Sequence, residues 1–243
     1  MSRTKSYYDV RDALTLPGCP MCRLRAGFTD QYLDRLIYEN VNDPGLRRKI
    51  RQARGFCKEH AGGLVRRGAA LGVSIMMHDV LREVLRVMDE GRFQALPTVS
   101  LTRVQEALDP KGPRSATTRF VSKLTPQTTC PVCVRAREME EAYYSAFLDN
   151  LLGEDGLLAL YSASDGLCLP HFRQVLKRVD REVTFRALVS AQRAIWARLE
   201  EQLSEAIRKS DYRFSSEPLG EEGKAWLRAL AIIAGERLER GKL

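Results

Sequence analysis

The sequence lacks several features that would assign it to a familiar class of protein. Among its 243 residues no apolar run approaches the ~18 residues that a membrane span needs, and the N-terminus has no apolar stretch typical of a secretory signal. Aromatic residues are few, at 7%, which argues against a surface that stacks single-stranded bases. The motifs of phosphate loops, dinucleotide-binding folds and hydrolase nucleophile elbows are missing too. We therefore expect a cytoplasmic protein with no membrane partner.

The composition permits a folded core but names no partner. Hydrophobic residues make up 44% of the chain, which argues against wholesale disorder. The 39 basic and 31 acidic residues give a net charge of +8, which is compatible with an anionic partner without being evidence of one. Six cysteines are present, and in a reducing cytosol they would be idle thiols unless a metal or a reaction uses them.

The cysteines belong to a motif pair that occurs twice. The first copy has Cys-Pro-Met-Cys at 19–22 and Cys-Lys-Glu-His at 57–60. The second has Cys-Pro-Val-Cys at 130–133 and Cys-Leu-Pro-His at 168–171, so that every motif residue is shifted by 111 positions. We interpret this match as an internal duplication.

The duplication suggests four regions. These are a first metal-binding unit at 1–95, a connector at 96–124, a second metal-binding unit at 125–210 and a C-terminal region at 211–243. The connector is rich in Pro, Ser and Thr, with one short helix expected near 102–108. A terminal amphipathic helix, expected at about 220–238, would pack back onto the body. Its apolar side is formed by Trp226, Leu227, Leu230, Ile233 and Leu238.

The apolar residues recur with a helical period and no segment alternates as a strand does, so the expected fold class is all-α. Each unit is expected to hold a helix that starts at Cys-Pro-x-Cys, then a short helix that ends near Gly55 or Gly166. A long helix would then open near Cys57 or Cys168 and run to the end of its unit. In the first unit, four glycines are expected to weaken or bend that helix: Gly62, Gly63, Gly68 and Gly72. Gly68 and Gly72 would also permit close helix packing.

The motifs have the composition of a metal site. Two cysteines separated by two residues can bind one ion from a helix start, and Cys-x-x-His adds a third sulfur and an imidazole nitrogen. Four such ligands are what tetrahedral Zn²⁺ takes. With each repeat closing its own site, two structural zinc ions are predicted. The expected ligand sets are Cys19, Cys22, Cys57 and His60 in the first unit and Cys130, Cys133, Cys168 and His171 in the second.

Other uses of the same residues stay open. Two iron–sulfur clusters would draw on the same eight ligands, and the spacing does not separate them from zinc. A dithiol redox motif normally lies on a strand-to-helix turn, which this sequence does not predict. Covalent haem attachment needs a histidine where Arg23 and Val134 stand.

The motifs also resemble an uncharacterised bacterial family that is described only as a domain of unknown function. The resemblance rests on the opening Cys-Pro-x-Cys, on 55–60 with 71–78, and on Gly-x-Cys-x-Pro-His-Phe at 166–172. It spans most of residues 5–180 and implies no activity. His78 resembles a position of that family and has no counterpart in the second repeat, where Val189 stands. We interpret His78 as an ordinary helix histidine beside Asp79, with an accessory functional role as the alternative.

A cluster of basic residues is the remaining candidate site. We consider it a candidate for binding nucleic acid or another polyanion, with a solvated helix face as the plainer interpretation. Its members are Arg47, Arg48, Arg51, Arg54, Arg66 and Arg67. The acidic run at 138–141 is likewise interpreted as a solvated face. The sequence therefore predicts a zinc-stabilised helical interaction protein with no assigned catalytic residue, whose partner is an unknown protein or a polyanion.

Overall fold

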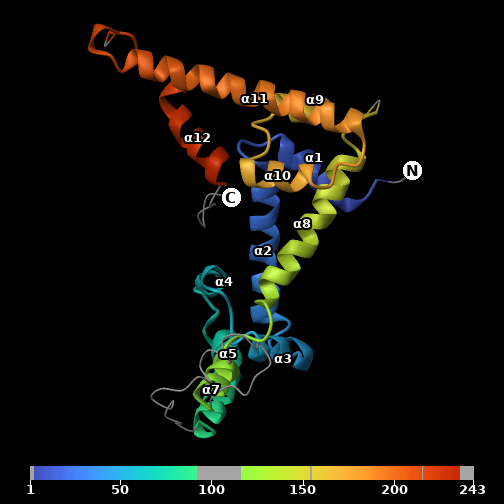
Figure 1. Cartoon of the computed structure of the whole chain (residues 1–243), viewed down its shortest axis with the longest axis vertical. Coiled ribbons are helices and arrows are strands. Elements are labelled where there is room, and N and C mark those ends of the chain that lie inside the picture. Colours follow the sequence, from blue (N-terminus) through green and yellow to red (C-terminus); the bar gives the residue numbers. More distant parts are fainter. Residues whose placement is uncertain (1–2, 92–115, 154, 215, 236–243) are drawn as a thin grey trace, which may run out of the picture. The chain divides into compact units, whose positions relative to one another are not determined.

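The computed structural model describes residues 3–91, 116–153, 155–214 and 216–235 (Figure 1). These residues form α-helices with two short 3₁₀ turns and no strand, which confirms the all-α prediction. The expected helix at 102–108 and Leu238 lie outside the described residues, as does most of the 96–124 connector.

The chain folds into two compact units that do not follow the repeat. Unit 1 combines Met1–Thr29 with Ala136–Leu243, and unit 2 is Asp30–Arg135. The boundaries fall inside two helices of equal length, α2 (Pro20–Tyr38) and α8 (Pro131–Asp149). Unit 2 is therefore inserted, in sequence, between the two segments of unit 1. These units do not coincide with the expected regions 1–95 and 125–210.

Unit 1 is built around its longest helix, α11 (Glu182–Lys209), along which α9 (Leu158–Ala163) lies (Figure 1). Its core contains buried side chains such as Val10, Phe147 and Leu188. The remaining elements of the unit are the start of α2, most of α8, α1 (Lys5–Leu14), α10 (Leu169–Leu176), the 3₁₀ turns at Tyr212–Phe214 and Glu221–Lys224, and α12 (Ala225–Ala234).

Unit 2 packs α3 (Pro44–Gln52) and α7 (Ala116–Leu124) against α5 (Ala70–Asp89), with α4 (Lys58–Gly63) as a short additional helix. The start of α3 follows from its sequence, because Pro44 suits a first helical turn and the Asp43 side chain accepts a hydrogen bond from the backbone N–H of Leu46.

The long helices expected after Cys57 and Cys168 are each broken in two, which corrects the sequence prediction. In unit 2 the chain leaves α4 at Gly63 and turns through Gly68, whose φ of 78° is in the left-handed region, before α5 begins. In unit 1 the break between α10 and α11 ends at Arg181, which is extended. No glycine or proline marks this second break, so the sequence carries no signal for it.

The C-terminal helix is present as α12 and contacts α10 and α11, but most of its expected apolar side is exposed. Ala225 is buried, whereas four larger side chains are half or more exposed. They are Trp226, Leu227, Leu230 and Ile233. The residue that α12 buries is therefore Ala225, and the four described residues of the expected apolar side stay at least half exposed.

Gly72 allows α5 to approach α2 closely inside unit 2. A Cβ at this position would lie 2.7 Å from the backbone oxygen of Ile37 and 3.1 Å from its Cγ2. We therefore expect Gly72→Ala to lower the free energy of unfolding by about 1–3 kcal/mol, the cost of overpacking a close contact. Denaturant unfolding monitored by circular dichroism measures the change.

Gly62→Ala is the matched control, because Gly62 lies in helix α4 and has no atom within 4 Å of its added Cβ. This substitution should leave stability unchanged or raise it by about 0.5–1 kcal/mol. Equal losses in the two variants would contradict the close contact at Gly72.

Candidate metal centres

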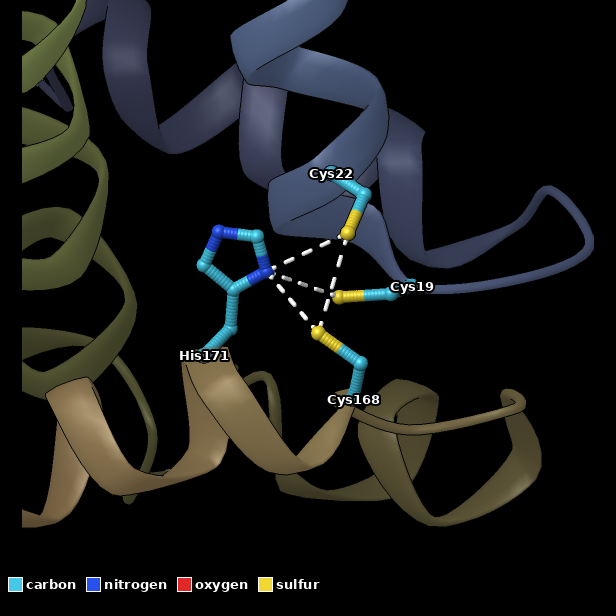
Figure 2. A group of neighbouring side chains, drawn as sticks. All are labelled: Cys19, Cys22, Cys168 and His171. Atoms are coloured by element: carbon cyan, nitrogen blue, oxygen red, sulfur yellow. Dashed lines mark hydrogen bonds between the residues drawn. The ribbon is translucent and has the colours of Figure 1, made fainter. Parts of the chain in front are cut away.

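Four ligating side chains converge in unit 1 and form what we call the first centre (Figure 2). Cys19 and Cys22 come from the start of α2, and Cys168 and His171 come from the start of α10. The His171 Nδ1 atom lies 3.5, 3.3 and 3.0 Å from the Sγ atoms of Cys19, Cys22 and Cys168. Cys22 Sγ and Cys168 Sγ are 3.7 Å apart, and all four residues are buried.

The second centre lies in unit 2 and has the same composition. It gathers Cys57 and His60 from the start of α4 with Cys130 and Cys133 from the start of α8. The His60 Nδ1 atom lies 3.1, 3.7 and 3.3 Å from the Sγ atoms of Cys57, Cys130 and Cys133. Cys57 Sγ and Cys133 Sγ are 3.6 Å apart. In each centre the four ligand atoms lie within 4.8 Å of one another, so each group could hold a metal ion.

The structure brings together all eight predicted residues but exchanges the motifs between the repeats. Cys19 and Cys22 lie with Cys168 and His171, not with Cys57 and His60. The pairing within each repeat, expected from the sequence, is therefore wrong. Each centre takes its Cys-x-x-Cys from one repeat and its Cys-x-x-His from the other.

Local backbone structure aims the ligands inward. Pro20 and Pro131 are the first residues of α2 and α8, a position that proline suits, and each follows a cysteine of the motif directly. Cys57 and Cys168 are the N-cap residues of α4 and α10. Because the histidine follows the cysteine by three positions, one turn of helix places both side chains on the same side.

The two glycines predicted at the ends of the short helices lie two residues before the N-cap cysteines of α4 and α10. Gly55 and Gly166 have φ values of 102° and 71°, which confirms that the chain needs a left-handed residue after the short helix. Both positions redirect the chain into the Cys-x-x-His turn.

Glu140 is a site residue that the sequence analysis missed. Its Oε1 lies 3.2 Å from His171 Nε2, the ring nitrogen that faces away from the sulfurs. A carboxylate there accepts a hydrogen bond from Nε2–H and keeps the proton on that nitrogen, so Nδ1 keeps a lone pair for a metal. The signal was its position on α8: Ala136 and Tyr144, four residues before and after Glu140, are buried on the same helical face.

The sulfurs in each centre disfavour one another's ionisation. Hydrogen bonds with Cys168 and Cys19, together with burial, raise the pKa of the Cys22 thiol well above its usual range. Burial and the neighbouring Cys57 raise the pKa of the Cys133 thiol to about 12. Without a cation these thiols therefore stay protonated at neutral pH, and a cation among them would favour the thiolate form.

The first centre also favours positive charge at its histidine. Burial by itself would lower the pKa of His171, but hydrogen bonds to Cys19 and Glu140 outweigh it and raise the pKa to about 9. Cys19 and Glu140 thus favour positive charge at the His171 ring, whose Nδ1 is the atom that a metal would bind.

Most of the predicted polyanion-binding arginines are engaged in ion pairs inside unit 2. Arg47 and Arg51 bind Asp79 at 2.7 and 3.0 Å, and Arg66 bridges two carboxylates on α2. Arg54 donates to the backbone oxygen of Lys123 and lies 3.9 Å from Glu83. Arg48 and Arg67 are exposed. Polyanion binding therefore stays a prediction, and these two arginines are the members of the cluster best placed for it.

The third histidine lies away from both centres. His78 is exposed on α5, and its neighbour Asp79 is paired with arginines of α3. His78 joins neither group of ligands.

Sequence comparison places the chain in a family. The model of a family of unknown function, DUF6062, matches residues 3–240, nearly the whole chain. The chain belongs to this family. It is also similar to an uncharacterised 23.9 kDa protein in the xynA 3′ region of Caldicellulosiruptor sp. (strain Rt8B.4). The two are 25% identical over 218 residues, which cover 89% of this chain and 95% of the relative.

Membership of DUF6062 thus agrees with the resemblance seen in the motifs and brings no activity with it. The comparison with solved structures finds no match. Across the described residues of this family member, no helix combines the length and apolarity needed to cross a membrane.

Proposed function

We propose that each centre binds one zinc ion through its four protein ligands and that the protein is a zinc-stabilised helical binding protein. The observation that carries this proposal is the spacing of the ligand atoms. A tetrahedral ion with Zn–S of about 2.3 Å and Zn–N of about 2.0 Å sets its sulfurs about 3.8 Å apart and its sulfur and nitrogen about 3.5 Å apart. The sulfur–sulfur distances of 3.7 and 3.6 Å fit that tetrahedron.

The same spacing favours a single ion over an iron–sulfur cluster. A cluster spreads its protein ligands over several iron atoms, so ligands on different irons lie farther apart than those of one tetrahedron. Here all four ligand atoms of each centre lie within 4.8 Å of one another. A single sulfur-binding ion in each centre therefore accounts for the spacing of its ligands.

A structural role follows from the number of ligands. Catalytic zinc keeps one position for water or substrate, whereas four protein ligands fill the tetrahedron. The two centres also use all six cysteines and two of the three histidines of the chain. What is left for function is the surface of a clamped helical scaffold, which supports a role in binding rather than catalysis.

The ions would hold together segments that are distant in sequence. The first centre joins the start of α2 to the start of α10, and the second joins the start of α4 to the start of α8. Helices of six and eight residues, such as α4 and α10, are too short to be stable alone in water. A metal at the N-terminus of each would supply the stability that their length does not.

Elemental analysis tests the proposal directly. The purified protein should carry two zinc ions per chain and be colourless, because zinc has no visible absorbance. Inductively coupled plasma mass spectrometry and native mass spectrometry measure the metal and its stoichiometry. Iron with sulfide, together with a broad visible absorbance after anaerobic purification, would favour the iron–sulfur alternative over zinc. A protein free of metal would contradict both proposals.

A further inference from the structure

The two centres have matching ligands but differ in how far their sulfurs are exposed. Cys22 and Cys168 of the first centre correspond, under the shift of 111 residues, to Cys133 and Cys57 of the second. The corresponding sulfur–sulfur distances are 3.7 and 3.6 Å. Cys22 and Cys168 are 7% and 0% exposed, whereas both Cys57 and Cys133 are partly exposed. The buried sulfurs of the first centre therefore serve as the control for the effect of solvent access on the sulfurs of the second.

Gly235, the residue that follows α12, lies near the first centre. A Cβ at Gly235 would lie 3.9 Å from Cys168 Sγ and 4.0 Å from Cys22 Sγ, so a side chain there would contact both sulfurs. Gly235 has a φ of 85°, which a residue with a side chain rarely adopts. Both sulfurs also belong to the core cluster of unit 1.

The partly exposed pair in the second centre has its two sulfurs close together. Cys57 is the N-cap of α4 and Cys133 lies in the first turn of α8, so their side chains come from different segments and meet at 3.6 Å. The other two ligands of this centre, His60 and Cys130, are buried at 2% and 7% exposure. An oxidant that arrives from solvent therefore meets Cys57 and Cys133 first.

We propose that Cys57 and Cys133 form an oxidation-sensitive thiolate pair, which peroxide converts into a disulfide with release of the ion from the second centre only. This inference rests on the metal binding proposed above. It adds a modification site and a difference in function between two centres of equal composition.

The chemistry balances with hydrogen peroxide as the oxidant. One thiolate attacks a peroxide oxygen, the O–O bond breaks, and a sulfenic acid and hydroxide form. The second thiolate attacks that sulfur, the S–S bond forms, the S–O bond breaks and a second hydroxide leaves. Two protons from solvent convert both hydroxides to water. Two electrons pass from the sulfurs to the peroxide, and the ion loses two of its four ligands.

The product keeps the two segments joined. A disulfide between Cys57 and Cys133 links the start of α4 to the start of α8, as the ion does. The covalent bond replaces part of the clamp, while His60 and Cys130 are freed from the metal. Oxidation thus changes unit 2 without separating its parts.

The test uses the full-length protein loaded with two zinc ions, whose metal content is measured first. Hydrogen peroxide is added in the presence of a chromogenic zinc chelator, and the disulfides are mapped by peptide mass spectrometry. We expect one ion to appear on the order of tenfold faster than the other, the difference being set by access to the thiolates. The disulfide should join Cys57 to Cys133, and a reductant with added zinc should restore the starting state.

A second measurement reads access without oxidation. N-ethylmaleimide, followed by mass spectrometry, should label Cys57 and Cys133 before Cys22 and Cys168. Release of both ions at one rate, earlier labelling of Cys22 and Cys168, a disulfide between Cys130 and Cys133, or resistance of both ions to peroxide would each overturn the inference. A protein that carries no metal at the start would instead contradict the proposed function.

Discussion

Chelation at neutral pH should unfold both units of this protein. Structural zinc contributes about 10 kcal/mol or more to the folding of small domains, which is comparable to the whole stability of a typical domain. Removal of the metal leaves three sulfurs and an imidazole in each centre without the ion that would join them, and the raised pKa values of Cys22 and Cys133 mean that these thiols take up protons instead. Loss of the helical circular dichroism signal and of the thermal transition, followed as the metal content falls, would measure the effect.

The control for this experiment is the same chelator already saturated with zinc, which should change nothing. Return of the helical signal when zinc is added to the chelated protein would show that the loss is reversible. Helicity and melting temperature that persist after complete removal of the metal would contradict a structural role for the ions.

Paired substitutions should count the ions and reveal which motifs share one. Cys19→Ser with His171→Ala removes two ligands of the same centre, so this variant should keep one zinc ion per chain. Cys19→Ser with His60→Ala damages both centres and should keep none. The two variants carry the same kinds of substitution and differ only in which histidine is lost, so each serves as the control for the other.

Native mass spectrometry of the soluble protein gives the number of ions directly. The opposite outcome, in which the variant with Cys19→Ser and His60→Ala keeps one ion and the other keeps none, would restore the pairing within each repeat. One ion retained in both variants would contradict a structure in which each motif contributes to a single centre.

The sequence was sufficient to identify the candidate ligands but not to predict which motifs share a centre. Residue types and spacing identified the eight candidate ligands, because Cys-x-x-Cys and Cys-x-x-His turns bring their side chains together locally. Which turn meets which is a long-range property, and both pairings are equally consistent with the two identical spacings. The structure exchanges them because α2 starts at the first centre, in unit 1, and its second half belongs to unit 2.

The chain does not come back after α2 because of how α3 packs. Ile50 of α3 shares a core with Leu33, Leu36 and Ile37, which lie in the second half of α2. Cys57 follows the end of α3 after four residues and is therefore held in unit 2, with Cys130 and Cys133. Knowing that apolar side chains in this segment are buried was within reach of the sequence; knowing which of them meet was not.

Glu140 illustrates the same limit at the scale of one side chain. An acidic run on a helix is usually solvated, and Glu141 does lie toward solvent, where it binds Arg178. Glu140 is one residue away but 100° around the helix, on the face that carries Ala136 and Tyr144. Its burial becomes favourable because His171 presents a nitrogen to it, and that contact joins residues 31 positions apart.

The insertion of unit 2 within unit 1 sets an order for assembly on the ribosome. Once Cys133 has emerged from the exit tunnel, the nascent chain holds every ligand of the second centre. Cys19 and Cys22 are synthesised first of all, yet they must wait for Cys168 and His171 before they can share an ion. The cysteines that are synthesised first are thus the last to gain their partner ligands. Until then, only a reducing environment keeps their thiols from oxidation.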